Sequence, residues 1–151
     1  MAYPQDGKLI VLESDTFANR LINRANLSTL ALAAGNTHEF IRLFESNIGC
    51  IGILDVDARS PQSILRTKAH QRIKIASLLS QNDSGSLVFA VMRHNAPDLT
   101  KDLLTAGFAA VFHSIGEHRR LANFVTRHRN SLPKREAAIE ETVLDLSLIH
   151  I

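Results

Sequence analysis

The sequence has few of the residues that several common kinds of site require. Its 151 residues include one cysteine, Cys50, which excludes an internal disulfide and any metal site built from several cysteines. No apolar run approaches the ~20 residues that a membrane-spanning helix needs. The first residues, MAYPQDGK, lack the charged and apolar regions of a secretory signal. We therefore expect a cytoplasmic protein without a membrane segment.

Motifs of common enzymes are also missing. The sequence contains no glycine-rich phosphate-binding loop and no serine nucleophile elbow, and its seven histidines form no pair with metal-ligand spacing. We therefore expect no enzymatic activity. A small-molecule-binding α/β domain remains an alternative, which would require an apolar pocket beyond the ends of the strands.

The sequence has little excess of positive over negative charge, with a formal net charge of +2. Six of the seventeen basic residues nevertheless lie between Glu117 and Arg135, and the acids from Glu136 to Asp145 follow without a basic residue. This change of sign indicates two functional surfaces or two solvated faces of adjoining helices. The basic patch is short and aromatic residues are few, so we expect nucleic-acid binding only through a missing output domain. A steep fall of binding with salt would favour a nucleic-acid function after all.

What the sequence does contain is five short apolar runs, each of which predicts a buried strand. The runs cover residues 8–12, 28–34, 50–56, 87–92 and 109–112. Helical spacing of apolar residues predicts five helices between and after them. The first begins near Asp15 or Thr16, either of which could cap it, and the second, third and fifth cover about 37–46, 62–80 and 117–130. The fourth opens with Asn95-Ala96-Pro97-Asp98 and ends at Gly107.

Two of the predicted helices carry specific expectations about their faces. In the third, we expect apolar residues to face inward: Leu65, Ala69, Ala76 and Leu79. Its basic residues are expected to face mostly outward: Arg66, Lys68, Arg72 and Lys74. The fourth helix carries three leucines, Leu99, Leu103 and Leu104. Gly107 ends this helix.

The order of the elements predicts the fold class. The strands are continuous apolar runs, which favours parallel strands covered by helices on both faces. Right-handed crossovers then give a doubly wound α/β fold whose ligand crevice lies at the carboxyl ends of the strands. Four acids follow strand ends at that edge, where we expect them to meet water: Glu13, Asp15, Asp55 and Asp57.

These acids are compatible with a reaction site. Carboxylates from neighbouring strand ends suit Mg²⁺, which could orient a phosphoryl group against one carboxylate acting as nucleophile. Acids also end strands for solubility and cap the helices that follow. Spacing alone favours neither interpretation.

Residues 8–130 resemble the receiver domain of bacterial response regulators, the CheY-like superfamily. KLIVLESD resembles that family's first strand with its acids, GILDVD its third strand, and LLTAGFAAVFHS its fourth helix through fifth strand. The resemblance implies a flavodoxin-like, five-stranded parallel sheet of order 2-1-3-4-5 in an α/β/α sandwich. It also implies that Asp55 is the phosphoacceptor candidate, with Mg²⁺ as the candidate metal.

Several positions depart from the family's pattern. Glu13 and Ser14 stand where two adjacent acids are usual, although Asp15 partly replaces the second. Met92 stands in place of the hydroxyl residue that binds the phosphoryl group, and Ala110 in place of the aromatic switch residue. His113 replaces the lysine that pairs with the phosphoryl group, and it is cationic only when protonated.

These departures predict a pseudo-receiver, a two-component-type signal-transduction module that acts by protein–protein contact. The alternative is a working phosphorelay receiver, phosphorylated on Asp55 by a histidine kinase. We divide the chain into a receiver-like domain, 1–132, and a linker or dimerisation helix, 133–151, leading to a possible missing output domain. The resemblance further implies a homodimer, formed through the fourth helix, fifth strand and fifth helix or through the carboxyl-terminal helix. Expected partners are a histidine kinase or another signalling protein.

Overall fold

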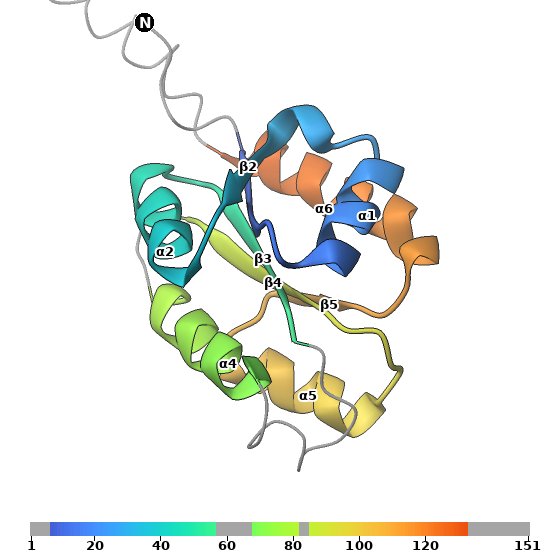
Figure 1. Ribbon diagram of the computed structural model, residues 1–151. Coiled ribbons are helices and arrows are strands. Elements are labelled where there is room, and N and C mark those ends of the chain that lie inside the picture. The colour runs from blue at the N-terminus through green and yellow to red at the C-terminus, as the bar shows by residue number, and fades with distance from the viewer. Residues whose placement is uncertain (1–6, 57–67, 82–84, 133–151) are drawn as a thin grey trace, which may run out of the picture.

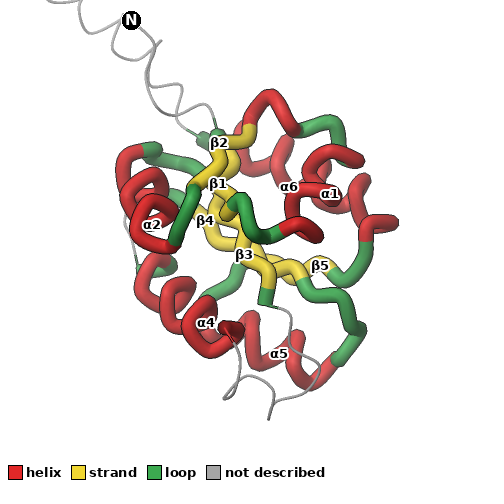
Figure 2. The backbone as a smooth tube through the Cα atoms, viewed as in Figure 1, coloured by secondary structure: helices red, strands yellow, loops and turns green. Residues whose placement is uncertain are grey.

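The computed structural model describes residues 7–56, 68–81 and 85–132. Within them, five parallel strands form one sheet in the order β2-β1-β3-β4-β5, as predicted (Figures 1 and 2). The strands span Leu9–Leu12 (β1), Ala31–Ala34 (β2), Ile51–Asp55 (β3), Leu87–Val91 (β4) and Ala110–Phe112 (β5). The α-helices span Thr16–Arg24 (α1), Thr37–Ser46 (α2), Lys68–Leu79 (α4), Pro97–Ala106 (α5) and His118–Ser131 (α6).

The helices cover both faces of the sheet, which confirms the doubly wound α/β class. Helices α1 and α6 lie side by side on one face, and α2, α4 and α5 follow one another on the other (Figure 1). Successive strand residues point to opposite faces, so that Leu9 and Val11 join the α1/α6 core while Ile10 and Leu12 join the other. Both faces of the strands are therefore apolar, as continuous runs require.

The second strand is shorter than the sequence predicts. Pairing with β1 begins at Leu9 opposite Ala31, so residues 28–30 have no neighbouring strand to bond. They form a 3₁₀ turn instead, η1, Ser28–Leu30. The prediction of a strand over 28–34 was therefore wrong for its first three residues, because a strand needs a partner along its length.

The structure explains why glycine stands at two positions, Gly52 and Gly107. A Cβ atom at Gly52 in β3 would lie 2.8 Å from Phe40 Cζ, so the bare backbone lets α2 pack directly on the sheet. Gly107 has a φ of 122° and ends α5, as the sequence predicted. In that helix Leu99 and Leu103 are buried, whereas Leu104 is 47% exposed.

The single cysteine is a buried thiol between α2 and the sheet. Cys50 Sγ lies 3.5 Å from the Phe44 carbonyl oxygen and 3.8 Å from Ser86 Oγ, and burial raises the pKa of Cys50 from 9.0 to about 11. Between pH 9 and 11 the unfolded chain ionises this thiol and the folded chain does not. The buried thiol therefore contributes fully to the free energy of unfolding below pH 9, and this contribution is lost as the pH rises from 9 to 11.

Between pH 8.5 and 11, we expect the free energy of unfolding of wild type to fall by roughly 2 kcal/mol more than that of Cys50→Ala, because only wild type carries the thiol. Urea titrations at a series of pH values measure the difference. A thiol reagent at pH 8 should react slowly with folded protein and rapidly in urea. Equal pH profiles for the two proteins would contradict the assignment.

Candidate functional site

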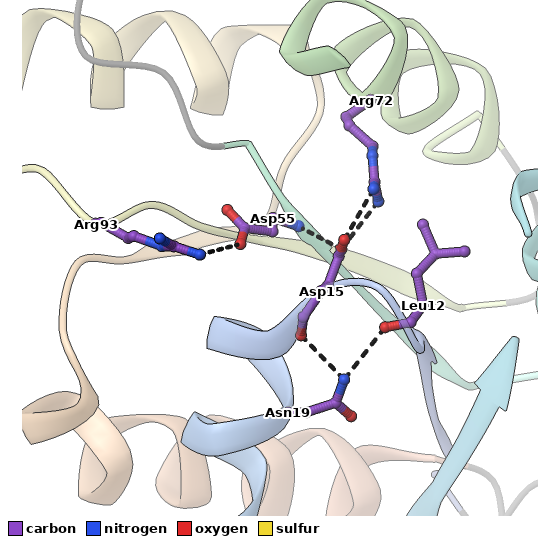
Figure 3. A network of polar contacts seen from close by, with 6 residues as sticks. All are labelled: Leu12, Asp15, Asn19, Asp55, Arg72 and Arg93. Atoms are coloured by element: carbon purple, nitrogen blue, oxygen red, sulfur yellow. Dashed lines mark hydrogen bonds and ion pairs between the residues drawn. The ribbon is translucent and has the colours of Figure 1, made fainter. Parts of the chain in front are cut away.

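The carboxylate of Asp15 is fully buried at the carboxyl edge of the sheet, just after β1. Asp15 occupies the N-cap position of α1, but its side chain does not cap that helix. Its two oxygens instead accept from Arg72 Nη1 and Nη2 at 2.9 and 2.8 Å, and Oδ2 also accepts from the Asp55 backbone N–H at 2.9 Å (Figure 3). Asp15 thus connects α1, β3 and α4 through one carboxylate.

Arg72 is the largest departure from the sequence expectation. We expected it to face outward, and the structure places it in the interior with 5% of its surface exposed. It follows Ala69 by three residues and precedes Ala76 by four, and both alanines are buried, so it lies on the inward face of α4. A guanidinium tolerates that burial only because a carboxylate pairs with both of its terminal nitrogens.

The turn that presents Asp15 is held by an asparagine one helical turn later. Asn19 Nδ2 donates to the carbonyl oxygens of Leu12 and Asp15 at 3.2 and 3.0 Å (Figure 3). The Asp15 backbone N–H donates to the Leu12 carbonyl oxygen at 3.0 Å. The side chain of Asp15 is therefore positioned by contacts on both sides of its own backbone.

Asp55 lies at the end of β3 on the same edge, but it is not exposed as predicted. Only 2% of the residue is exposed. Its Oδ2 lies 3.9 Å from Arg93 Nη2, a side chain that is half exposed and sits 5.9 Å from the centre of the Phe17 ring. Arg93 was not among the residues predicted for the site, although its position two residues after β4, the neighbour of β3, places it at the same edge.

The structure describes three of the four predicted metal ligands and brings two of them together. Asp15 and Asp55 lie together, Glu13 is exposed with its backbone N–H bonded to the Ala34 carbonyl, and Asp57 lies outside the described residues. Among the described residues, no three His, Cys, Asp or Glu side chains gather where an ion could bind. Both oxygens of Asp15 already pair with a cation. Asp15 therefore has its counter-ion within the chain.

The residues that depart from the receiver pattern are either buried or in polar contact with their neighbours. Met92 is fully buried, with its backbone N–H bonded to the Phe112 carbonyl at 2.9 Å, and Ala110 is buried in the α1/α6 core. Both ring nitrogens of His113 have neighbours: Nε2 lies 3.2 Å from Thr100 Oγ1, and Nδ1 lies 3.2 Å from the His94 carbonyl oxygen. His113 is therefore engaged by the loop after β4 and by α5.

Comparison with solved structures identifies the fold. A signal receiver domain from Vibrio parahaemolyticus, of a protein described as a Luxo repressor, is 18% identical with a TM-score of 0.57, covering 91% of this chain and 96% of that one. A Burkholderia pseudomallei protein described as pilus assembly-related is 16% identical with a TM-score of 0.60, covering 89% and 98%. A response regulator from Thermotoga maritima is 12% identical with a TM-score of 0.59, covering 83% and 99%.

The chain is thus a three-layer α/β/α protein with a doubly wound parallel sheet. More particularly, it has the fold of response regulator receiver domains, as the sequence resemblance implied. No protein-family model matches the chain, and no curated protein does. None of the helices among the described residues has the length and apolar character needed to cross a membrane.

Proposed function

We propose that this chain is a pseudo-receiver: a signalling module that binds other proteins and does not depend on phosphorylation of Asp55. It is a binding module and not an enzyme. The observation that carries the proposal is the pairing of Asp15 with Arg72. A guanidinium tethered to α4 supplies the positive charge at this edge, so the carboxylate needs no divalent cation.

The second support is the balance of charge around Asp55. Two buried carboxylates, Asp15 and Asp55, face two guanidiniums, Arg72 and Arg93. Phosphorylation would replace the single negative charge of the Asp55 carboxylate with about two on the phosphoryl group at pH 7, so this edge would gain about one negative charge without a matching guanidinium. Met92 offers no hydroxyl to that group, and His113 already contacts Thr100 and His94.

A working phosphoacceptor is the second candidate function, and one observation favours it. Arg93 is half exposed and 3.9 Å from the Asp55 carboxylate, so it could accompany a phosphoryl group in the role that the absent lysine has in the family. The acceptor oxygen would have to become accessible first, since Asp55 is buried.

Intact mass spectrometry after incubation with acetyl phosphate and Mg²⁺ distinguishes the two functions. We expect the wild-type mass to stay unchanged, and beryllofluoride with Mg²⁺ to leave the melting temperature unchanged. Asp55→Asn is the matched control, because it removes the acceptor oxygen with little change of shape. A phosphoryl adduct on wild type that is absent from Asp55→Asn would reject the pseudo-receiver and establish the alternative.

The binding partners of this chain are also part of the proposal. We propose contacts with a histidine kinase or another signalling protein, and a homodimer through α5, β5 and α6 or through residues 133–151. The latter segment lies outside the described residues. Light scattering over a concentration series would reveal the dimer as a doubling of mass.

A further inference from the structure

Helices α1 and α6 share an outer surface of unusually uniform composition. They lie side by side on one face of the sheet (Figure 1) and bury their apolar residues in the same core. Their exposed positions hold only arginine, asparagine, threonine and serine. On α1 these are Thr16, Arg20, Asn23 and Arg24; on α6 they are Arg119, Arg120, Asn123, Thr126, Arg127, Arg129, Asn130 and Ser131.

Six arginines lie on these two helices, and neither helix contains an acid. The acids next to these helices along the chain are Glu13, Asp15 and Glu117. Asp15, directly before α1, is buried and paired with Arg72, and the Glu117 carboxylate accepts from the His113 backbone N–H and contacts Arg120. The opposite layer has mixed charge, with acids on both α2 and α5. Among the described residues, the helices on this face are thus basic, whereas those of the opposite layer carry charges of both signs.

We propose that the outer surface of α1 and α6, the α1/α6 face, binds the phosphate backbone of a nucleic acid. Arginine, asparagine, threonine and serine are residue types that contact phosphate in protein–nucleic acid complexes. The arginine fork matches phosphate oxygens in pairs. This inference departs from the sequence-based expectation that nucleic acid binds only through an output domain, and it does not rest on the proposed signalling function.

Part of the face is ordered in advance. The Arg120 guanidinium lies 4.6 Å from the centre of the Phe112 ring and donates to the Val111 carbonyl oxygen at 2.7 Å. Arg127 lies 6.0 Å from the centre of the Phe124 ring. Side chains held on aromatic rings lose less conformational freedom when a phosphate binds.

The composition argues against two other anionic partners. Protein interfaces have an apolar, often aromatic centre, and membrane-surface helices insert large apolar side chains. The α1/α6 face exposes neither. Among the described residues, the large exposed apolar side chains are Leu78 and Leu104, which belong to α4 and α5 on the other layer.

Fluorescence anisotropy with labelled duplex DNA and single-stranded RNA tests the proposal on the full 151-residue chain. With about four phosphate contacts, affinity should fall roughly a hundredfold between ~50 and ~200 mM salt, with little dependence on sequence. Arg20→Gln/Arg119→Gln should make the slope of log K against log salt shallower by about 2 and weaken binding roughly tenfold or more at ~50 mM salt.

The matched control is Lys74→Gln/Lys101→Gln, which removes two exposed charges from the opposite layer. We expect it to change affinity by less than about threefold, since it leaves the α1/α6 face intact. Equal losses in the two double variants, or no binding by either nucleic acid at low salt, would overturn the proposal. Tighter binding to phosphatidylserine vesicles or polyglutamate at equal anion concentration would overturn the choice of nucleic acid as partner. Unchanged melting temperatures show that the variants fold.

Discussion

Replacing Arg72 with methionine is expected to lower the free energy of unfolding by about 3–5 kcal/mol. Methionine keeps most of the apolar stem but leaves the Asp15 carboxylate buried with only the Asp55 N–H as a described partner. A buried charge without its counter-ion must be neutralised or must draw water into the interior. Urea unfolding followed by circular dichroism measures the change.

The double variant shows whether the loss comes from the charge. Asp15→Asn in the Arg72→Met background removes the stranded charge and keeps an acceptor for the Asp55 N–H. We expect it to recover more than half of the loss, with a coupling energy of at least about 2 kcal/mol between the two positions. Lys74→Met on the exposed side of α4 should stay within about 0.5 kcal/mol of wild type. An Arg72→Met variant as stable as Lys74→Met would contradict the buried ion pair.

Phe89→Ala is expected to cost about 3–5 kcal/mol of the free energy of unfolding. Phe89 is fully buried in β4, and its ring centre lies 5.6 Å from that of Phe112 and 5.9 Å from that of Phe124. Alanine would leave a cavity between the sheet and α6 that these rings cannot fill without moving. Thermal and urea unfolding measure the loss.

A position on the other layer serves as the control for Phe89. Leu104→Ala removes a large side chain that is already 47% exposed, so we expect less than about 1 kcal/mol. The Phe89 variant should also loosen the contacts of Arg120 and Arg127 with the rings of Phe112 and Phe124. Similar losses for Phe89→Ala and Leu104→Ala would mean that the aromatic cluster is not a packed part of the core.

The geometry of the candidate site supports the proposed pseudo-receiver function, in which a receiver fold keeps its acids without their usual task. Asp15 and Asp55 remain at the edge where the fold brings strand ends together, but arginines accompany both. These arginines neutralise the negative charges of the two neighbouring carboxylates, which would otherwise repel each other. The edge becomes a fixed connection between α1, β3 and α4, which suits a module that presents a constant surface to its partners.

Much of the fold was predictable because it depends on local patterns. The runs KLIVL, GILDV and LVFAV are apolar without alternation, which only a strand buried on both faces accommodates. The position of Asp55 at the end of β3 and the end of α5 at Gly107 follow from residue type and spacing. The strand order came from resemblance to a known family, and the structure confirms it.

The sequence by itself determined the alternation of strands and helices, the class of fold and the edge at which the acids gather. Only the tertiary structure decided that Arg72 is buried, that Asp15 pairs with it, and that α1 adds two arginines to those of α6. The physical reason is that burial of a charge depends on its partner. Asp15 and Arg72 are 57 residues apart, and helical spacing could place Arg72 inward but could not supply the carboxylate that makes this position stable.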